Sequence, residues 1–241
     1  MTHDAALAWR EETVGAIGTC RPPGRPARPE RPELRSPGEM PRRRGAAGRV
    51  ALLHAIAHIE LNAIDLAWDM IARFADPALP RAFYDDWVAV ADEEAKHFEL
   101  LSKRLAGLGA AYGDLPAHDG LWDAARQTAH DVLARLAVAP LVLEARGLDV
   151  TPGMIDRLDQ AGDTESVAVL RVILEDEIGH VATGRRWFVR IAESRGLDPA
   201  ETFQSLVRDH YRGRLKPPFN RNARDAAGFE PGWYEPLAAN A

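Results

Sequence analysis

Two short stretches of this sequence carry the same acid–imidazole pair. DEEAKHFEL and, further along the chain, EDEIGHVAT each contain a glutamate followed three positions later by a histidine. The pairs are Glu94 with His97 and Glu177 with His180. Residues at i and i+3 lie on one face of an α-helix, so each pair can present a carboxylate and an imidazole to a single point. One such pair is common by chance, but two on two long predicted helices indicate a metal site.

Two further glutamates precede these pairs at matching distances. Glu60 lies in HAIAHIELNAIDL and Glu144 in VAPLVLEARGLD, and the residues at helical spacing from each are apolar. An ionised carboxylate on a core-facing stripe is costly unless a cation compensates it. Glu60 precedes Glu94 by 34 residues and Glu144 precedes Glu177 by 33. The sequence therefore predicts two similar pairs of helices. In each pair the first helix supplies one glutamate and the second supplies Glu-x-x-His.

The predicted ligand set contains four carboxylates and two imidazoles. Its members are Glu60, Glu94, His97, Glu144, Glu177 and His180. Four carboxylates balance two divalent cations, and mixed oxygen and nitrogen donors suit iron or manganese better than structural zinc. The single cysteine, Cys20, offers no thiolate cluster. The sequence therefore predicts a dinuclear site with two iron ions, and manganese or a mixed manganese–iron pair as alternatives. No catalytic residue is expected beyond the ligands.

An additional acid stands immediately before each ligand glutamate of the two pairs. These acids are Glu93 and Asp176. A metal-bound imidazole usually donates its second N–H to a carboxylate, which fixes its tautomer. In an antiparallel bundle Asp176 would reach His97 and Glu93 would reach His180. The alternative interpretation is that both are ordinary solvated acids on helix surfaces. His54 and His58 do not share the face of Glu60, and we interpret them as packing or hydrogen-bonding histidines.

The elements that must position these residues are predicted to be helices. Apolar periodicity predicts four long helices, over 46–75, 81–107, 120–147 and 164–195. Pro140 is expected to kink the third helix, and Gly147 to cap its C-terminus. Shorter helices are expected over 152–161 and from Pro199 to about 212. No alternation typical of a β-strand is present, so the sequence predicts an all-α protein.

We expect three segments. The first is an N-terminal helix with a Pro/Arg-rich strap (1–45), the second is a four-helix bundle with extra short helices and the dinuclear metal site (46–212), and the third is an irregular C-terminal tail that packs on the bundle (213–241). Residues 18–49 hold nine arginines against three glutamates, whereas the whole chain has a formal charge of −6. The favoured interpretation is a strap docked on an acidic helical body, and the alternative is contact with nucleic acid.

Composition limits the possible locations and partners. A single cysteine excludes an intrachain disulfide, and no apolar run of membrane-span length or secretory signal is evident. We therefore expect a cytoplasmic protein without a membrane partner, as a monomer or dimer.

The six predicted ligands resemble those of the ferritin-like di-iron carboxylate superfamily, which includes ferritins, rubrerythrins, ribonucleotide reductase small subunits, bacterial multicomponent monooxygenases and a tRNA-modifying hydroxylase. More narrowly, LLHAIAHIEL, EARGLDVTPGM, EDEIGHVATG and PPFNRNARDAAGF resemble the bacterial DUF455 ferritin-like family over roughly residues 20–237. The superfamily resemblance implies a four-helix bundle around two metal ions. It does not specify a reaction.

The expected function is an O2-activating oxidoreductase, a hydroxylase or oxidase, acting on an organic or RNA substrate with an external electron donor. The alternative is ferritin-like or rubrerythrin-like metal binding, or detoxification of peroxide or iron without an organic substrate. The absence of a cysteine-rich segment argues against a rubrerythrin. A third possibility is a metal-dependent scaffold without turnover.

Overall fold

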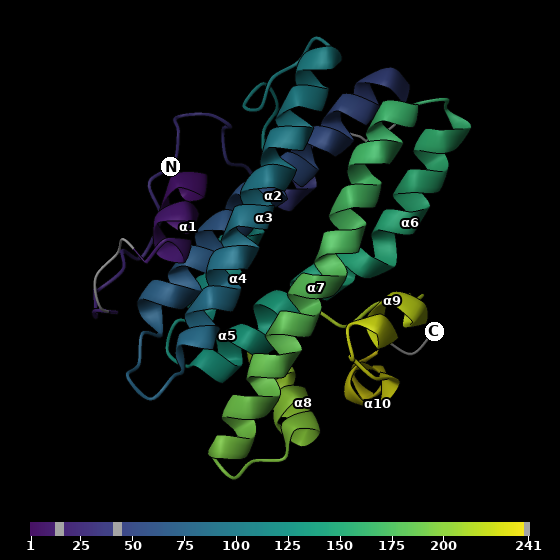
Figure 1. The fold of residues 1–241 in the computed structure, drawn as a ribbon. Coiled ribbons are helices and arrows are strands. Elements are labelled where there is room, and N and C mark those ends of the chain that lie inside the picture. The colour runs from purple at the N-terminus through teal and green to yellow at the C-terminus, as the bar shows by residue number, and fades with distance from the viewer. Residues whose placement is uncertain (13–16, 41–44, 239–241) are drawn as a thin grey trace. The chain divides into compact units, whose positions relative to one another are not determined.

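The chain forms two compact helical units (Figure 1). A computed structural model describes residues 1–12, 17–40 and 45–238, without the side chains of the first two residues of the last range. The described residues form helices and two isolated bridges, but no β-strand. The predicted all-α class is therefore confirmed. The N-terminal unit is Met1–Asp123 and the C-terminal unit is Ala124–Ala241.

Two long adjacent helices dominate the N-terminal unit, α2 (Gly45–Arg73) and α3 (Arg81–Gly107), in close agreement with prediction. The other elements are α1 (Thr2–Arg10), η1 (Pro37–Glu39) and α4 (Gly120–Gln127), which contains the boundary between the units. Helix α1 packs on α3, and α3 packs on α2. The connection from α2 to α3 is held by Tyr84, whose hydroxyl donates to the carbonyl of Asp76 at 3.1 Å and accepts from its N–H at 3.0 Å.

The Pro/Arg-rich strap docks on the helices of the N-terminal unit. Nη2 of Arg28 donates to Oδ1 of Asn62 at 2.7 Å and lies 3.0 Å from a carboxylate oxygen of Asp65, both on α2. Nε1 of Trp122 on α4 donates to the carbonyl of Gly24 at 3.0 Å. The favoured interpretation of the strap is confirmed where the structure describes it. Nucleic-acid contact remains an open prediction, and residues 41–44, which include three strap arginines, lie outside the described residues.

Helix α2 contains an apolar run that the sequence analysis did not identify. Residues Ala47–Arg73 have the length and hydropathy that would permit a membrane span, contrary to the expectation that no such run exists. However, 67% of the most apolar window is buried inside the structure. The same length and composition are typical of a buried core helix, because such a helix is apolar on more than one face.

The C-terminal unit differs from prediction between 120 and 161. Its elements are α5 (Val132–Val138), the π-helical η2 (Ala139–Glu144), α6 (Ala145–Gln160), α7 (Thr164–Ser194), α8 (Pro199–His210), α9 (Arg221–Ala226), α10 (Pro231–Tyr234) and η3 (Glu235–Leu237). The prediction of one helix over 120–147 is wrong. The chain breaks before Asp131, whose side chain caps α5 by accepting from the N–H groups of Leu133 and Ala134. Pro140 then interrupts the α-helical ladder, and it lies inside the π segment Ala139–Glu144.

The predicted helix end at Gly147 and the restart at Pro152 are also wrong, because α6 runs through both residues. Proline lacks the N–H that would bond to the carbonyl four residues earlier, which is that of Leu148. Here Nδ2 of Asn220 donates to that carbonyl at 3.1 Å. A residue from the distant tail therefore supplies the hydrogen bond that Pro152 cannot make, and the helix continues.

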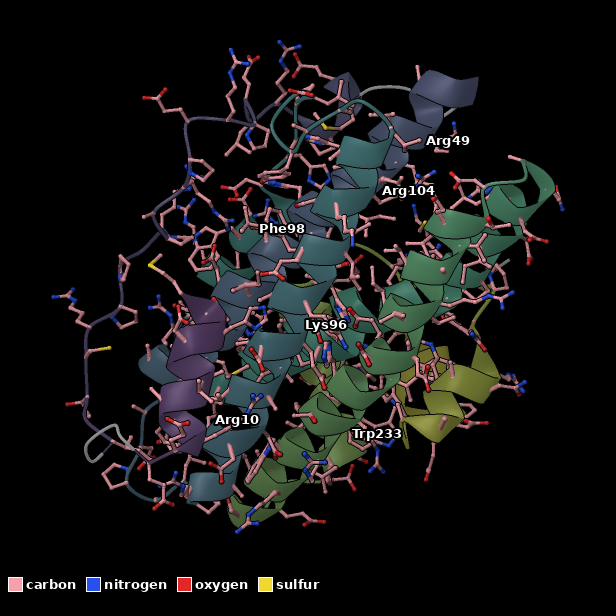
Figure 2. All side chains as sticks on the ribbon, turned by 45° about the horizontal axis from the view of Figure 1, so that its top comes forward. Arg10, Arg49, Lys96, Phe98, Arg104 and Trp233 are labelled. Carbon is pink, nitrogen blue, oxygen red and sulfur yellow. The ribbon has the colours of Figure 1, made fainter. Side chains whose placement is uncertain are left out.

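The tail is more ordered than predicted. It contains α9, α10 and η3, and Asn220 caps α9 by accepting from the N–H of Ala223. Trp233, labelled in Figure 2, packs against Phe188 of α7 and Phe203 of α8 with ring centroids 5.9 and 5.6 Å apart. This aromatic packing integrates the tail into the C-terminal unit. The predicted three-segment division stays a prediction, and residues 13–16 and 239–241 within it lie outside the described residues.

One glycine of α7 permits the close approach of the π segment. A Cβ added at Gly184 would lie 2.5 Å from Cβ and 2.6 Å from Cγ of Pro140. We predict that Gly184→Ala destabilises the protein by about 1–3 kcal/mol, because the rigid proline ring cannot move aside. Denaturant-induced unfolding measures this free energy.

Gly179 provides the matched control on the same helix, because a Cβ there meets nothing within 4 Å. Gly179→Ala should leave the protein unchanged or stabilise it by up to about 1 kcal/mol, as expected for a helix interior. Equal effects of the two substitutions would show that the contact with Pro140 does not constrain α7.

Candidate metal centre

Helices α2 and α3 bring three of the predicted ligands together inside the N-terminal unit. Glu60 is 3% exposed, and Glu94 and His97 are 0% exposed. Nδ1 of His97 lies 3.3 Å from Oε2 of Glu60 and 3.3 Å from Oε2 of Glu94. Each residue offers one ligand atom within 4.8 Å of the others. The sequence prediction that these three side chains share one buried location agrees with this geometry.

The distances fit coordination of one cation. Ligand atoms bonded at about 2.1 Å to the same ion lie roughly 3.0–3.4 Å apart in octahedral or tetrahedral geometry. The separations of 3.3 Å fall in this range. They are longer than the usual N–H···O hydrogen bond of about 2.9–3.0 Å. In addition, Nδ1 has at most one proton to share between two carboxylates. The donor set therefore fits a divalent transition-metal ion.

The electrostatics of the cluster favour positive charge. Burial alone lowers the pKa of His97, but hydrogen bonds and charge interactions with Glu60 and Glu94 outweigh this effect and raise the pKa to about 10. Two buried carboxylates thus stabilise a cation between them, and without metal the imidazolium proton supplies part of that charge. A divalent ion would replace the proton, because a metal-bound imidazole nitrogen must be deprotonated.

Small side chains one turn away make room for the ligands. Ala57 and Ala63 lie three residues before and after Glu60, and Ala91 lies three residues before Glu94. All three alanines are buried. Residues at this spacing share the ligand's face of the helix, so alanine keeps the space beside each carboxylate open. The local sequence therefore presents the acids without crowding them.

The C-terminal unit repeats the pair on α7. Glu177 and His180 are buried, and Nδ1 of His180 lies 3.7 Å from Oε2 of Glu177. Glu144 is half-buried and is the last residue of the π segment. Sequence reasoning predicted an irregularity at Pro140 but not a π-helix, a form that often occurs at functional sites.

Glu93 and Asp176 are both half-buried. The predicted hydrogen bonds, from His180 to Glu93 and from His97 to Asp176, stay predictions.

The two histidines that we set aside have structural partners. Nδ1 of His58 and the hydroxyl of Tyr112 are 2.8 Å apart, and Nε2 of His54 accepts from the N–H of Gly113 at 2.9 Å. The ring of Tyr112 stacks on both imidazoles, and Phe98 (Figure 2) meets it edge-on. Burial, with a smaller contribution from nearby positive charge, lowers the pKa of His58 to about 4, so this imidazole is neutral. The interpretation of both histidines as packing and hydrogen-bonding residues is confirmed.

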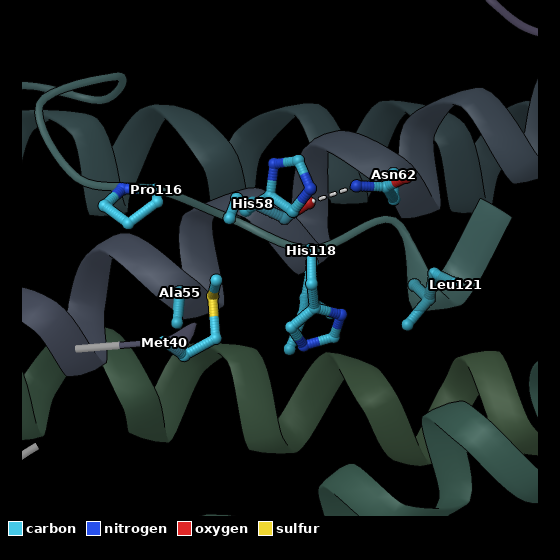
Figure 3. Close-up of a pocket in the computed structure, with 9 residues that line it drawn as sticks. Met40, Ala55, His58, Asn62, Pro116, His118 and Leu121 are labelled. Carbon is cyan, nitrogen blue, oxygen red and sulfur yellow. Dashed lines mark hydrogen bonds between the residues drawn. The ribbon is translucent and has the colours of Figure 1, made fainter. Parts of the chain in front are cut away.

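A small cavity lies beside His58 (Figure 3). Its volume is ≈ 30 Å³, and its lining includes Met40, Asn62 and His118. The amide of Asn62 donates to the carbonyl of His58 at 2.7 Å. A space of this size holds about one water molecule. It is therefore too small to receive an organic substrate.

Replacing one buried carboxylate tests the N-terminal cluster as a metal site. We predict that Glu94→Gln weakens binding of Mn²⁺ by at least about tenfold. Removal of a group that only hydrogen-bonds to a metal ligand already costs about 10–100-fold in metal affinity, and removal of a ligand itself should cost at least as much. Titration calorimetry with the metal-free protein measures the affinity. Glu99→Gln, on the same helix with a side chain 67% exposed, is the control. Equal affinities of the two variants would exclude Glu94 as a ligand.

Comparison with known proteins places the chain in a family. The model of a family described as "Protein of unknown function (DUF455)" matches residues 1–235. An uncharacterized protein of Haemophilus influenzae is 45% identical over 205 residues, which are 82% of this chain and 71% of that protein. No solved structure matches the chain. The family match covers nearly the whole sequence, so the chain belongs to the DUF455 family.

Proposed function

We propose that this protein is a dinuclear metal carboxylate protein of the ferritin-like superfamily, and that it uses two iron ions to activate O2 for oxidation of an organic or RNA substrate. The observation that carries the proposal is the buried cluster of Glu60, Glu94 and His97. Two buried carboxylates beside one imidazole are not needed for a stable hydrophobic core. Replacing a buried ion pair by apolar residues of similar volume often leaves the stability of the folded protein unchanged or raises it. A binding role accounts for their presence.

The C-terminal unit supplies the second half of the proposed site. Glu144, Glu177 and His180 repeat the residue types, the order and nearly the spacing of the first cluster. Each half contributes two carboxylates, which balance one divalent ion, and one imidazole. In the proposal the two halves together hold two ions. This assignment rests on the repeated pattern and on the burial of Glu177 and His180.

The bound iron ions would supply the redox chemistry, since amino-acid side chains alone do not reduce O2. The protein's own contribution is positional and electrostatic. Glu60 and Glu94 neutralise the charge of an ion, and His97 provides a nitrogen ligand. Trp87 lies on α3 two turns before Glu94 and is buried, as is Trp187 two turns after His180 on α7. Each ring lies on the same face of its helix as the nearby ligands and adds apolar surface to the core.

Metal stoichiometry tests whether both halves contribute to metal binding. Protein purified from iron-replete cells should contain about two metal ions per chain by elemental analysis, because the proposed charges balance two divalent ions. Glu60→Ala and Glu144→Ala should each lose at least one ion, whereas Glu99→Gln should keep both. Full metal content in Glu144→Ala would refute the participation of the C-terminal unit.

Oxygen consumption tests the reaction class. The iron-loaded protein, reduced without air and then mixed with O2, should consume O2 at a rate above that of free Fe²⁺ and develop an optical absorption band. The zinc-loaded protein is the control, because Zn²⁺ has no redox chemistry. Absence of O2 consumption by the iron-loaded protein would refute the oxidoreductase assignment. Uptake of many iron ions per chain by a large shell on size-exclusion chromatography would instead establish iron storage.

A further inference from the structure

The C-terminal unit contains a basic cavity that the proposed metal site does not use. Its volume is ≈ 320 Å³, and it is lined by residues of η2, α6, α9 and the segment that follows α8. Four of the lining side chains are cationic: Arg146, Arg214, Lys216 and Arg224. Only one lining residue, Asp149, is acidic. The lining therefore carries a formal charge of +3, from four cations and one acid.

Arg224 is the buried end of this cavity. Its side chain is 2% exposed, and Nε and Nη2 bind the carboxylate of Asp149 at 2.9 and 2.7 Å. Nη1 is buried as well and has no hydrogen-bond partner among the described residues. A buried N–H of a charged group without an acceptor is costly and rare in proteins. An acceptor inside the cavity would satisfy it.

The neighbouring rings hold the Arg224 guanidinium in place. It lies over Tyr234 at 4.4 Å and over Phe219 at 5.0 Å from the ring centroids. Together with the two bonds to Asp149, these contacts fix its orientation before any ligand arrives. The arginine is therefore preorganised.

The remaining cations surround an opening to solvent. Nη1 of Arg146 donates to the carbonyl of Lys216 at 2.7 Å, which holds the segment after α8 against α6. Arg214 and Lys216 are exposed. Within the part of the chain that the structure describes, neither side chain makes an ion pair. Asp149 is fully buried and pairs with Arg224, and its Oδ2 also lies 3.6 Å from Nη1 of Arg146. Arg214 and Lys216 are therefore the two lining cations that this acid does not neutralise.

We propose that this cavity binds the phosphate group of a small phosphorylated molecule. Guanidinium groups match phosphate oxygens in pairs, and a lining with a net formal charge of +3 suits a dianion better than a singly charged carboxylate. The volume lies at the lower end of the range of about 300–1,000 Å³ for small-molecule sites. The rings of Tyr211 and Phe219 line the same cavity and offer a surface to the organic part. A cavity of this size admits a terminal phosphate more readily than a continuous RNA backbone.

The site is separate from the proposed metal ligands. Val142 and Arg146 line the cavity and lie two residues before and after Glu144. Two residues correspond to a rotation of about 200° on a helix, so Glu144 faces away from the cavity. The phosphate proposal therefore does not rest on metal binding.

Titration calorimetry of the full chain with inorganic phosphate and with phenyl phosphate tests the proposal, at constant ionic strength maintained with chloride. We expect saturable binding of both. The double variant Arg214→Gln/Lys216→Gln should bind at least about tenfold more weakly, since it loses the two lining cations that Asp149 does not neutralise. Both residues are exposed, so the variant should fold normally, which circular dichroism checks. Arg157→Gln is the matched control, because Arg157 is an exposed arginine of α6 outside the cavity lining and should leave the affinity unchanged.

Three outcomes would overturn the proposal. Phosphate could produce no saturable heat beyond that of chloride, or the double variant could bind as tightly as the unsubstituted protein. A single-stranded RNA could bind through the same two residues without competition from free phosphate, which would assign the surface to a macromolecule. Glu144→Ala should retain phosphate binding, so failure of the metal proposal is distinguishable from failure of this one.

Discussion

The contact of His97 with two buried carboxylates is the constraint on which the N-terminal unit depends. Glu60 and Glu94 come from consecutive helices, and their oxygens lie at equal distances from one imidazole nitrogen. Such an arrangement requires α2 and α3 to pack in one fixed register, because a shift of one residue would turn each acid by about 100°. It also requires a positive charge at the centre. The loop that Tyr84 holds and the alanines beside the ligands help to fix this register of α2 against α3.

In the C-terminal unit, the corresponding constraint is the accommodation of two prolines. Pro140 interrupts the helix before Glu144, and the absence of a side chain on Gly184 allows α7 to approach the ring. Pro152 leaves a carbonyl of α6 without its usual donor, and Asn220 supplies one. The tail that brings Asn220 also brings Arg224 to Asp149. The same docking therefore completes α6 and builds the wall of the basic cavity.

These long-range contacts explain which features the sequence could predict. Helices α2, α3 and α7 follow from apolar periodicity and from clear boundaries, such as Pro80 before α3 and Gly196 after α7. The face shared by Glu94 and His97 follows from their spacing alone. The continuity of α6 depends on Asn220, which is 72 residues from Leu148, so no local window contains the reason. The basic cavity could not be predicted from local sequence for the same reason, since Arg224 and Asp149 are 75 residues apart. The pattern also gives no measure of how deeply Glu144 is buried.

The number of ligands in each half has a chemical consequence for the proposed function. Structural metal sites are closed by protein donors, whereas catalytic sites keep a position for water or substrate. Each half offers two carboxylates and one imidazole, and iron or manganese ions commonly take more than three ligands. On the proposed assignment, each ion would keep open positions unless carboxylates chelate or bridge. Helices α2 and α3 also pack directly on each other, and the strap docks on α2. On this proposal, a centre that leaves coordination positions open is better suited to binding and reduction of O2 than to structural support.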